Sequence, residues 1–315
     1  MAARAHAEDD DLATSRLGAA PAPDFVLDLL RELRAGNYLP PAWGRFLWRS
    51  WGVSRATARE HPRLAASWRR HAAGLALAAA AALGLEAAAG GAEGRHAARG
   101  AAPAAALCLG YTLFDGYVHL ALNRCARGEP LHETLGVPST LTLARGTVAA
   151  LLFAHLCART AATKPAVIAA LGIAIVTDIA DGTLARATGR TTRLGAYLDG
   201  EVDFGFGIAL WLTLAARRLL PAWLVALSLV RWMGPLVYAL GSYFGWANRI
   251  DIGSTVTGKA AGVAQAATVG VALLPARFTA RVPRLRTALH VATAALLLAA
   301  PLMQLRKVVR GRAER

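Results

Sequence analysis

Cysteine is scarce in this chain of 315 residues, which contains only Cys108, Cys125 and Cys157. Their spacing matches neither a zinc site nor a disulfide framework, so we expect buried, unreactive thiols. The N-terminal residues are acidic and lack an apolar core, which argues against a cleavable signal peptide. No long stretch alternates between apolar and polar residues, so we expect no strands and predict an all-α fold.

Lysine is equally rare, because the formal net charge of +15 comes almost entirely from arginine and the chain has only three lysines. A basic balance of this size suits nucleic acid or anionic lipid. The arginines cluster at the ends of apolar runs and in both tails, and no basic groove with interleaved aromatic residues is present. We therefore expect membrane lipid as a partner and no nucleic acid.

Hydrophobic residues are abundant, at 55% of the chain, and the mean hydropathy is +0.38. Apolar runs of about 20 residues are typical of transmembrane helices. We predict such runs at 72–90, 101–122, 141–160, 165–185, 195–216, 219–243, 257–275 and 286–304. Pro221 and Pro235 should bend or delimit the sixth. The sequence thus predicts a multi-pass integral membrane protein with both termini in the cytoplasm.

Residues 1–70 are predicted to form a cytosolic or interfacial extension with a disordered start. An amphipathic helix is indicated by Val26, Leu29, Leu30 and Leu33 and should end at Pro40 and Pro41. Tryptophans and arginines then alternate, which suits either the headgroup zone of a membrane or a small folded cap that buries the tryptophans. Two extra transmembrane helices should follow over residues 71–130. Residues 306–315 should form a basic cytosolic tail.

Four aspartates lie in one otherwise apolar stretch. Asp178 and Asp181 share one helix face, and Asp199 and Asp203 share another. A charge at membrane depth costs about 2.5–3.5 kcal/mol or more, so it needs a partner or a function. A short turn near residues 188–193 would let the two faces pack antiparallel and enclose one or two cations. Oxygen-only ligands favour Mg²⁺, Mn²⁺ or Ca²⁺ over zinc, so we predict a divalent-metal site.

Small residues and an arginine accompany these aspartates. Gly182, Ala185 and Gly195 would let a ligand approach the helix backbone, although small residues also serve ordinary helix packing in membranes. Arg186 could hold a phosphate with two hydrogen bonds or could form a structural salt bridge. These residues alone leave both alternatives open.

The aspartate region contains the pattern D-x-x-D-G-x-x-A-R-x8-G-x3-D-x3-D, which defines the CDP-alcohol phosphatidyltransferase family. The chain resembles that family at every specified position: Asp178, Asp181, Gly182, Ala185, Arg186, Gly195, Asp199 and Asp203. An earlier segment, V-P-S-T-L-T-L-A-R, resembles the family's P-N-x-L-T-x-x-R. Thr142 and Arg145 match it, and Ser139 stands where asparagine is usual. A later segment, S-T-V-T-G-K, resembles S-x-x-x-G-K and ends at Lys259.

The resemblance covers residues 136–305 and implies a catalytic domain of six transmembrane helices. It implies metal-dependent transfer of a phosphatidyl group from CDP-diacylglycerol to a small polar alcohol, with release of CMP, in phospholipid synthesis. Glycerol phosphate, inositol phosphate and an amino alcohol remain open as acceptors. By this resemblance the four aspartates would hold Mg²⁺ or Mn²⁺, two ions in expectation, and Asp203 would also act as general base. The implied substrate-binding residues are Gly182, Ala185, Arg186, Thr192, Gly195, Ser139, Thr142 and Lys259.

The active site would face the cytoplasm from the plasma membrane, and the enzyme could be a homodimer. One alternative within the family uses a CDP-amino alcohol as donor and diacylglycerol as acceptor. An alternative of another class is a cation or solute transporter that uses the acidic cluster. The glycine and arginine positions argue against a transporter, since a cation pathway has no need of them. The identity of the acceptor does not follow from the sequence.

Overall fold

A computed structural model describes residues 24–125, 129–160, 162–245, 255–279 and 281–313. Within these ranges the regular structure is helical, with eleven α-helices and one short 3-10 helix, which confirms the predicted all-α class. The predicted disordered start, before residue 24, lies outside these ranges. The described residues divide into two compact units, one up to residue 213 and one from residue 214 onward. Each unit is described by itself.

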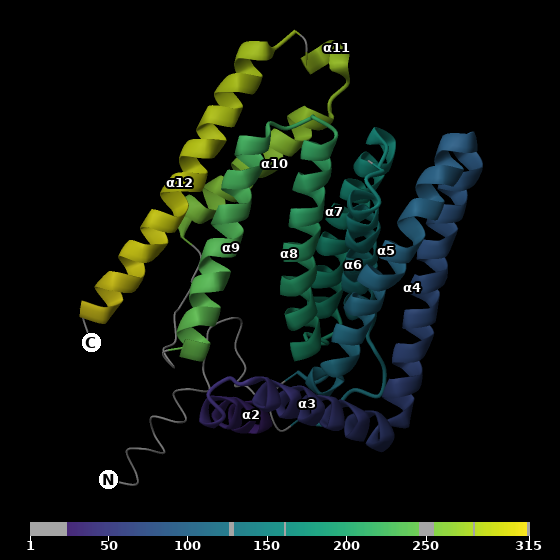
Figure 1. Cartoon of the computed structure of the whole chain (residues 1–315), viewed down its shortest axis with the longest axis vertical. Helices are drawn as coiled ribbons and strands as arrows, with labels where there is room; N and C mark the ends of the chain where they lie inside the picture. Colours follow the sequence, from purple (N-terminus) through teal and green to yellow (C-terminus); the bar gives the residue numbers. More distant parts are fainter. Residues whose placement is uncertain (1–23, 126–128, 161, 246–254, 280, 314–315) are drawn as a thin grey trace. The chain divides into compact units, whose positions relative to one another are not determined.

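The first unit contains a bundle of long helices with two further helices running across one end of it (Figure 1). Its elements are α2 (Asp24–Ala35), α3 (Pro40–Glu60), α4 (Pro62–Ala89), α5 (Gly91–Val118), η1 (Leu120–Leu122), α6 (Val137–Cys157), α7 (Lys164–Ala187) and α8 (Arg193–Ala216). The helix α5 packs on both α4 and α6, and α7 packs on α6. The helices α2 and α3 lie across the ends of α4 to α8.

The predicted amphipathic helix is α2, and its apolar side is buried. The buried residues are Leu29, Leu30 and Leu33. The prediction that Pro40 and Pro41 end this helix is wrong. It ends at Ala35, and Asn37 and Tyr38 then reverse the chain with positive φ angles of 50° and 56°. The two prolines occupy the first turn of α3, where a missing N–H costs no hydrogen bond.

The tryptophans that follow differ in their burial. Trp51 of α3 is half-buried and stacks on Phe114 of α5 at a ring-centroid distance of 5.5 Å, and it also packs on Tyr117. Trp43 and Trp48 are 37% and 72% exposed. A folded cap thus accounts for Trp51 but not for the two exposed rings.

Every predicted apolar run coincides with a long helix. Four helices in the described part of the chain are long and apolar enough to cross a membrane: α4, α6, α7 and the first 21 residues of α12. The helix α8 carries Asp199, Glu201 and Asp203 in its first half, which reduces its apolar character. The predicted pair of helices over residues 71–130 corresponds to α4 and α5, although α4 already begins at Pro62.

The second unit consists of α9 (Ala222–Gly245), α10 (Val256–Leu273), the short α11 (Ala276–Thr279) and α12 (Pro283–Ala313). The helix α12 packs on α9 and α10, and the hydroxyls of Thr268 and Thr293 are 2.9 Å apart. Pro221 directly precedes α9, so it delimits this helix as predicted, whereas Pro235 lies within it. Most of the predicted tail, residues 306–315, continues α12 as far as Ala313.

Candidate functional site

The hairpin of α7 and α8 carries the aspartates. Gly189 follows the end of α7 with a φ of +63°, a conformation that favours glycine, and the N–H of Arg190 donates to the carbonyl of Ala185 at 3.0 Å. This is the usual way in which a helix ends with a reversing glycine. The helix α8 then begins at Arg193, so the predicted short turn between the two helices is present.

The start of α8 is fixed by a cap and by packing. The N–H of Gly195 donates to the hydroxyl oxygen of Thr192 at 3.0 Å, which satisfies a free donor of the first turn. Leu194 and Leu198 of α8 are buried in one apolar cluster with Leu143 of α6. Because these leucines hold one side of α8 against α6, the rotation of α8 about its axis is set.

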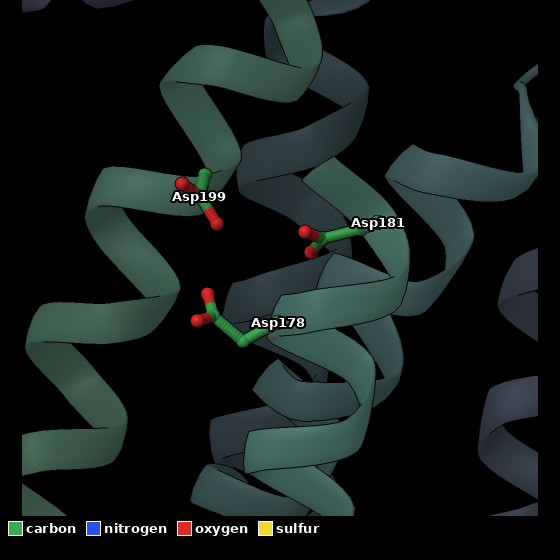
Figure 2. A group of neighbouring side chains, drawn as sticks. All are labelled: Asp178, Asp181 and Asp199. Carbon is green, nitrogen blue, oxygen red and sulfur yellow. The ribbon is translucent and has the colours of Figure 1, made fainter. Parts of the chain in front are cut away.

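The acidic side chains of α7 and α8 point toward one another (Figure 2). One carboxylate oxygen from each of Asp178, Asp181 and Asp199 lies within 4.8 Å of the others. The side chain of Asp181 is 9% exposed, whereas those of Asp178 and Asp199 are 56% and 46% exposed. The cluster therefore has one carboxylate at its base and is open to a ligand on the other side.

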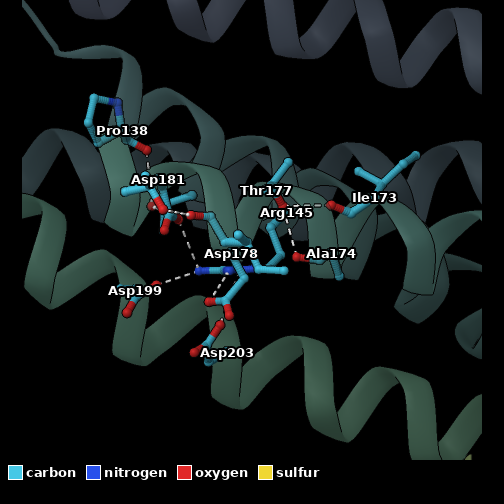
Figure 3. A network of polar contacts seen from close by, with 12 residues as sticks. Pro138, Arg145, Ile173, Ala174, Thr177, Asp178, Asp181, Asp199 and Asp203 are labelled. Carbon is cyan, nitrogen blue, oxygen red and sulfur yellow. Dashed lines mark hydrogen bonds and ion pairs between the residues drawn. The ribbon is translucent and has the colours of Figure 1, made fainter. Parts of the chain in front are cut away.

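Arg145 of α6 lies at the centre of the aspartates (Figure 3). Its Nη1 donates to Asp178 at 2.6 Å, and its Nη2 contacts Asp199 and lies 3.4 Å from Asp181. Its Nε lies 3.1 Å from Asp203 in an ion pair that is not aligned as a hydrogen bond. The side chain of Arg145 is only 2% exposed. Four carboxylates from two helices thus converge on one buried cation from a third.

Thr142 lies one turn before Arg145 on the same face of α6. Its hydroxyl donates to Asp181 at 2.9 Å and also lies 3.2 Å from the carbonyl oxygen of Pro138. Sequence reasoning proposed Thr142 as a substrate contact, and the structure shows that it orients the buried carboxylate. The sequence analysis gave Arg145 no role in the site. An arginine within an apolar span needs an anionic partner, and this requirement could have identified Arg145 as a partner of the aspartates.

Three other predicted substrate residues meet at the start of α8. A Cβ atom added to Gly195 would lie 3.2 Å from the hydroxyl oxygen of Thr192 and 3.5 Å from that of Ser139. Thr192 and Ser139 are both buried. The contact with Ser139 would be an ordinary one, whereas the Thr192 hydroxyl would have to shift by a few tenths of an ångström to admit a larger residue at position 195.

Gly182, Ala185 and Arg186 lie on the last turns of α7. The Arg186 side chain is exposed, and a Cβ atom on Gly182 would lie 3.3 Å from its Nη1. The guanidinium thus folds back over the glycine, on the same helix as Asp178 and Asp181. This places a second cation at the hairpin that carries the carboxylates.

Lys259 lies in the second unit, so its place relative to the aspartates stays a prediction. It is exposed near the start of α10, and Ser254 of the same motif lies outside the described residues. Arg231 of α9 donates to the carbonyl of Gly258 at 2.8 Å and to the side-chain oxygen of Gln265 at 2.9 Å. Arg231 therefore ties the start of α10 to α9.

The oxygen-only donor set fits a hard divalent ion. Oxygen ligands lie about 2.0–2.1 Å from Mg²⁺ and about 2.3–2.6 Å from Ca²⁺, so opposite ligands are about 4.2 Å or about 4.6–5.2 Å apart. The carboxylate oxygens lie within 4.8 Å of one another, a limit that is inside the Ca²⁺ range and about 0.6 Å above the Mg²⁺ value. Asp178, Asp181 and Asp199 can therefore hold such an ion once their oxygens move slightly closer and the Arg145 guanidinium, which contacts the same three side chains, makes room for it.

The family model for CDP-alcohol phosphatidyltransferase matches residues 135–302, which is more than half of the chain. The matched range includes all four aspartates, Arg145 and Lys259. Among curated proteins and solved structures, none matches this chain.

Proposed function

Because the chain belongs to the CDP-alcohol phosphatidyltransferase family, we propose that it transfers a phosphatidyl group from CDP-diacylglycerol to a small polar alcohol and releases CMP. The chain is an integral membrane enzyme of the kind that acts on CDP-alcohols in phospholipid synthesis. The observation that carries the finer proposal is the convergence of Asp178, Asp181 and Asp199, with Asp203 joined to them through Arg145.

The chemistry assigns the four carboxylates two roles. Asp178, Asp181 and Asp199 would hold Mg²⁺ or Mn²⁺, and two ions are expected if Asp203 shares one of them. Bound ions supply positive charge that stabilises the phosphate during transfer. The donor pyrophosphate would approach from the side of the half-exposed Asp178 and Asp199, away from the buried Asp181.

Asp203 is the proposed general base. Its side chain is 52% exposed and it lies outside the close group of three, so one of its oxygens is accessible to an acceptor hydroxyl. Asp203 would take the proton of that hydroxyl. The resulting oxygen attacks the phosphorus that carries diacylglycerol, and the bond from that phosphorus to CMP breaks. CMP leaves with the electrons of this bond.

Lys259 supports an acceptor that itself carries a phosphate, such as glycerol phosphate or inositol phosphate, because an intramembrane cation needs an anionic partner. Arg231 fixes the backbone next to Lys259 through the carbonyl of Gly258. We further propose that the site faces the cytoplasm from the plasma membrane, because the C-terminal tail is rich in arginine.

The transporter alternative is disfavoured by Arg145. A guanidinium that contacts all four carboxylates stands where a transported cation would have to pass. A transported cation would have to pass this guanidinium to reach the other side of the membrane, whereas a catalytic ion needs only to bind beside it from one side.

The test uses the purified full-length protein with CDP-diacylglycerol, Mg²⁺ and a panel of alcohols, with lipid products identified by mass spectrometry. The expected result is one new phospholipid and one CMP per transfer, and no product in excess EDTA. A parallel reaction with CDP-choline or CDP-ethanolamine and diacylglycerol tests the alternative donor. Product in that reaction alone, or full turnover in EDTA, would contradict the proposal.

A further inference from the structure

Arg145 is the one buried cation that contacts all four carboxylates in the described part of the chain. We propose that it is a positioning residue that competes with divalent ions for the carboxylates and couples ion binding to binding of the anionic donor. This inference rests on the proposed function, because it takes the carboxylates as the ion ligands.

The contacts explain the competition. The guanidinium engages one oxygen of each carboxylate, and the side chains of Asp178, Asp199 and Asp203 remain about half-exposed on the side away from it, whereas Asp181 is buried. An ion must either bind beside the guanidinium, against its charge, or displace it from some of these oxygens. Both routes reduce ion affinity compared with a cluster that lacks the arginine. In return, the arginine keeps four like charges from separating the two helices.

The charges explain the coupling. Four carboxylates and one guanidinium give the cluster a net charge of about −3. One divalent ion brings it to about −1 and two bring it to about +1, which favours a pyrophosphate donor that carries about two negative charges. Without Arg145 the same loading with two ions gives a neutral cluster. The arginine therefore lowers the affinity of the cluster for ions and raises the affinity of the ion-loaded cluster for the donor.

Burial strengthens this coupling. With 2% of its side chain exposed, Arg145 has almost no access to water. When ions take the carboxylate oxygens, the guanidinium loses partners, and a buried cation without an anionic partner is costly. The donor's pyrophosphate, which must reach the same carboxylate-bound ions, is an anion that can replace those partners. Ion and donor binding should thus favour each other.

The test compares the full-length wild type with Arg145→Gln in detergent, by thermal unfolding in EDTA and across a MgCl₂ titration. The control is Arg190→Gln, which removes the same charge from an exposed position in the turn between α7 and α8. We expect Arg145→Gln to unfold at a lower temperature in EDTA and to be stabilised by about tenfold less Mg²⁺ than wild type. We also expect its affinity for CDP in saturating Mg²⁺ to be about tenfold weaker. The Arg190 variant should match wild type in all three measurements.

Arg145→Lys provides a second route if the glutamine variant does not fold. A lysine keeps the charge, but one ammonium cannot reach four carboxylates at once. Its Mg²⁺ midpoint should stay within about threefold of wild type while its unfolding temperature in EDTA falls. A Mg²⁺ midpoint that is tenfold lower for the lysine variant would overturn the inference about Arg145 and leave the proposed ion site standing. An unchanged or higher Mg²⁺ midpoint for the glutamine variant would do the same. Absence of Mg²⁺ stabilisation in wild type overturns the proposed ion site as well.

Discussion

Replacing Thr142 with valine removes a single hydroxyl from the base of the site while keeping the shape of the side chain. That hydroxyl donates to Asp181 at 2.9 Å, and Thr142 is 2% exposed. Asp181 is itself 9% exposed, so water cannot easily replace the lost donor. Its remaining partner from α6 is the Nη2 of Arg145, at 3.4 Å. The substitution therefore weakens control over the orientation of the buried carboxylate.

The size of the effect follows from the type of bond. A hydrogen bond to a charged group contributes about 1.5–3 kcal/mol. If this energy serves to hold Asp181 in the geometry needed for transfer, turnover should fall by roughly tenfold to a hundredfold. Thr147→Val is the matched control on the same helix. Thr147 is also buried, at 5% exposure, and its hydroxyl donates only to the carbonyl of Leu143, one turn earlier, at 3.0 Å.

The assay is the initial rate of CMP release at saturating Mg²⁺ and CDP-diacylglycerol, with thermal unfolding measured on the same samples. Thr147→Val should stay within about twofold of wild type, because the Leu143 carbonyl keeps its backbone partner in the helix. Equal losses for the two variants would show that α6 tolerates no loss of a hydroxyl, whatever it contacts. A Thr142→Val enzyme with more than half of the wild-type rate would refute the role assigned to this hydrogen bond.

Three further outcomes are expected. Asp203→Asn should lower turnover by about a hundredfold or more and leave CDP binding in place, whereas Glu201→Gln on the same helix should be active; near-normal turnover of the first variant rules out the general base. Gly195→Ala adds a methyl 3.2 Å from the threonine oxygen that caps α8 and should weaken donor binding, while Gly200→Ala, with nothing within 4 Å, should not; equal donor affinities count against a crowded donor pocket. A nitroxide label at Leu47, which is 62% exposed, should be more accessible to oxygen than to a water-soluble nickel complex in lipid nanodiscs, and the reverse order excludes an interfacial α3.

The helices could be predicted because an apolar run of sufficient length indicates a helix by itself. Their boundaries were harder, since hydropathy marks the apolar part of a helix and not its hydrogen-bonded extent. The helix α4 begins at Pro62, ten residues before the predicted run, and its first turns include Arg69 and Arg70. The two prolines at 40 and 41 were assigned to the end of one helix because a proline stops a helix that precedes it. The same residue also suits the first turn of the helix that follows.

The aspartate faces could also be predicted, because spacings of three and four residues place side chains on one side of a helix. The short turn between α7 and α8 then made it reasonable that the two faces meet. The orientation of the third helix, α6, could not be predicted in this way. Which residues of α6 face the aspartates depends on its rotation, and the packing of Leu143 against Leu194 and Leu198 sets that rotation. No spacing within one helix contains this information.

The requirement that buried charges be balanced could nevertheless have indicated that Arg145 pairs with the aspartates. Thr142 and Arg145 are three residues apart, as are Asp178 and Asp181, so α6 presents a pair of hydrogen-bond donors where α7 presents a pair of acceptors. An arginine inside an apolar span needs an anion for the same reason that the aspartates need a cation. When apolar spans of one chain contain both an arginine and a surplus of carboxylates, the economical arrangement brings them together. The ion site and its arginine are therefore best understood as one electrostatic unit.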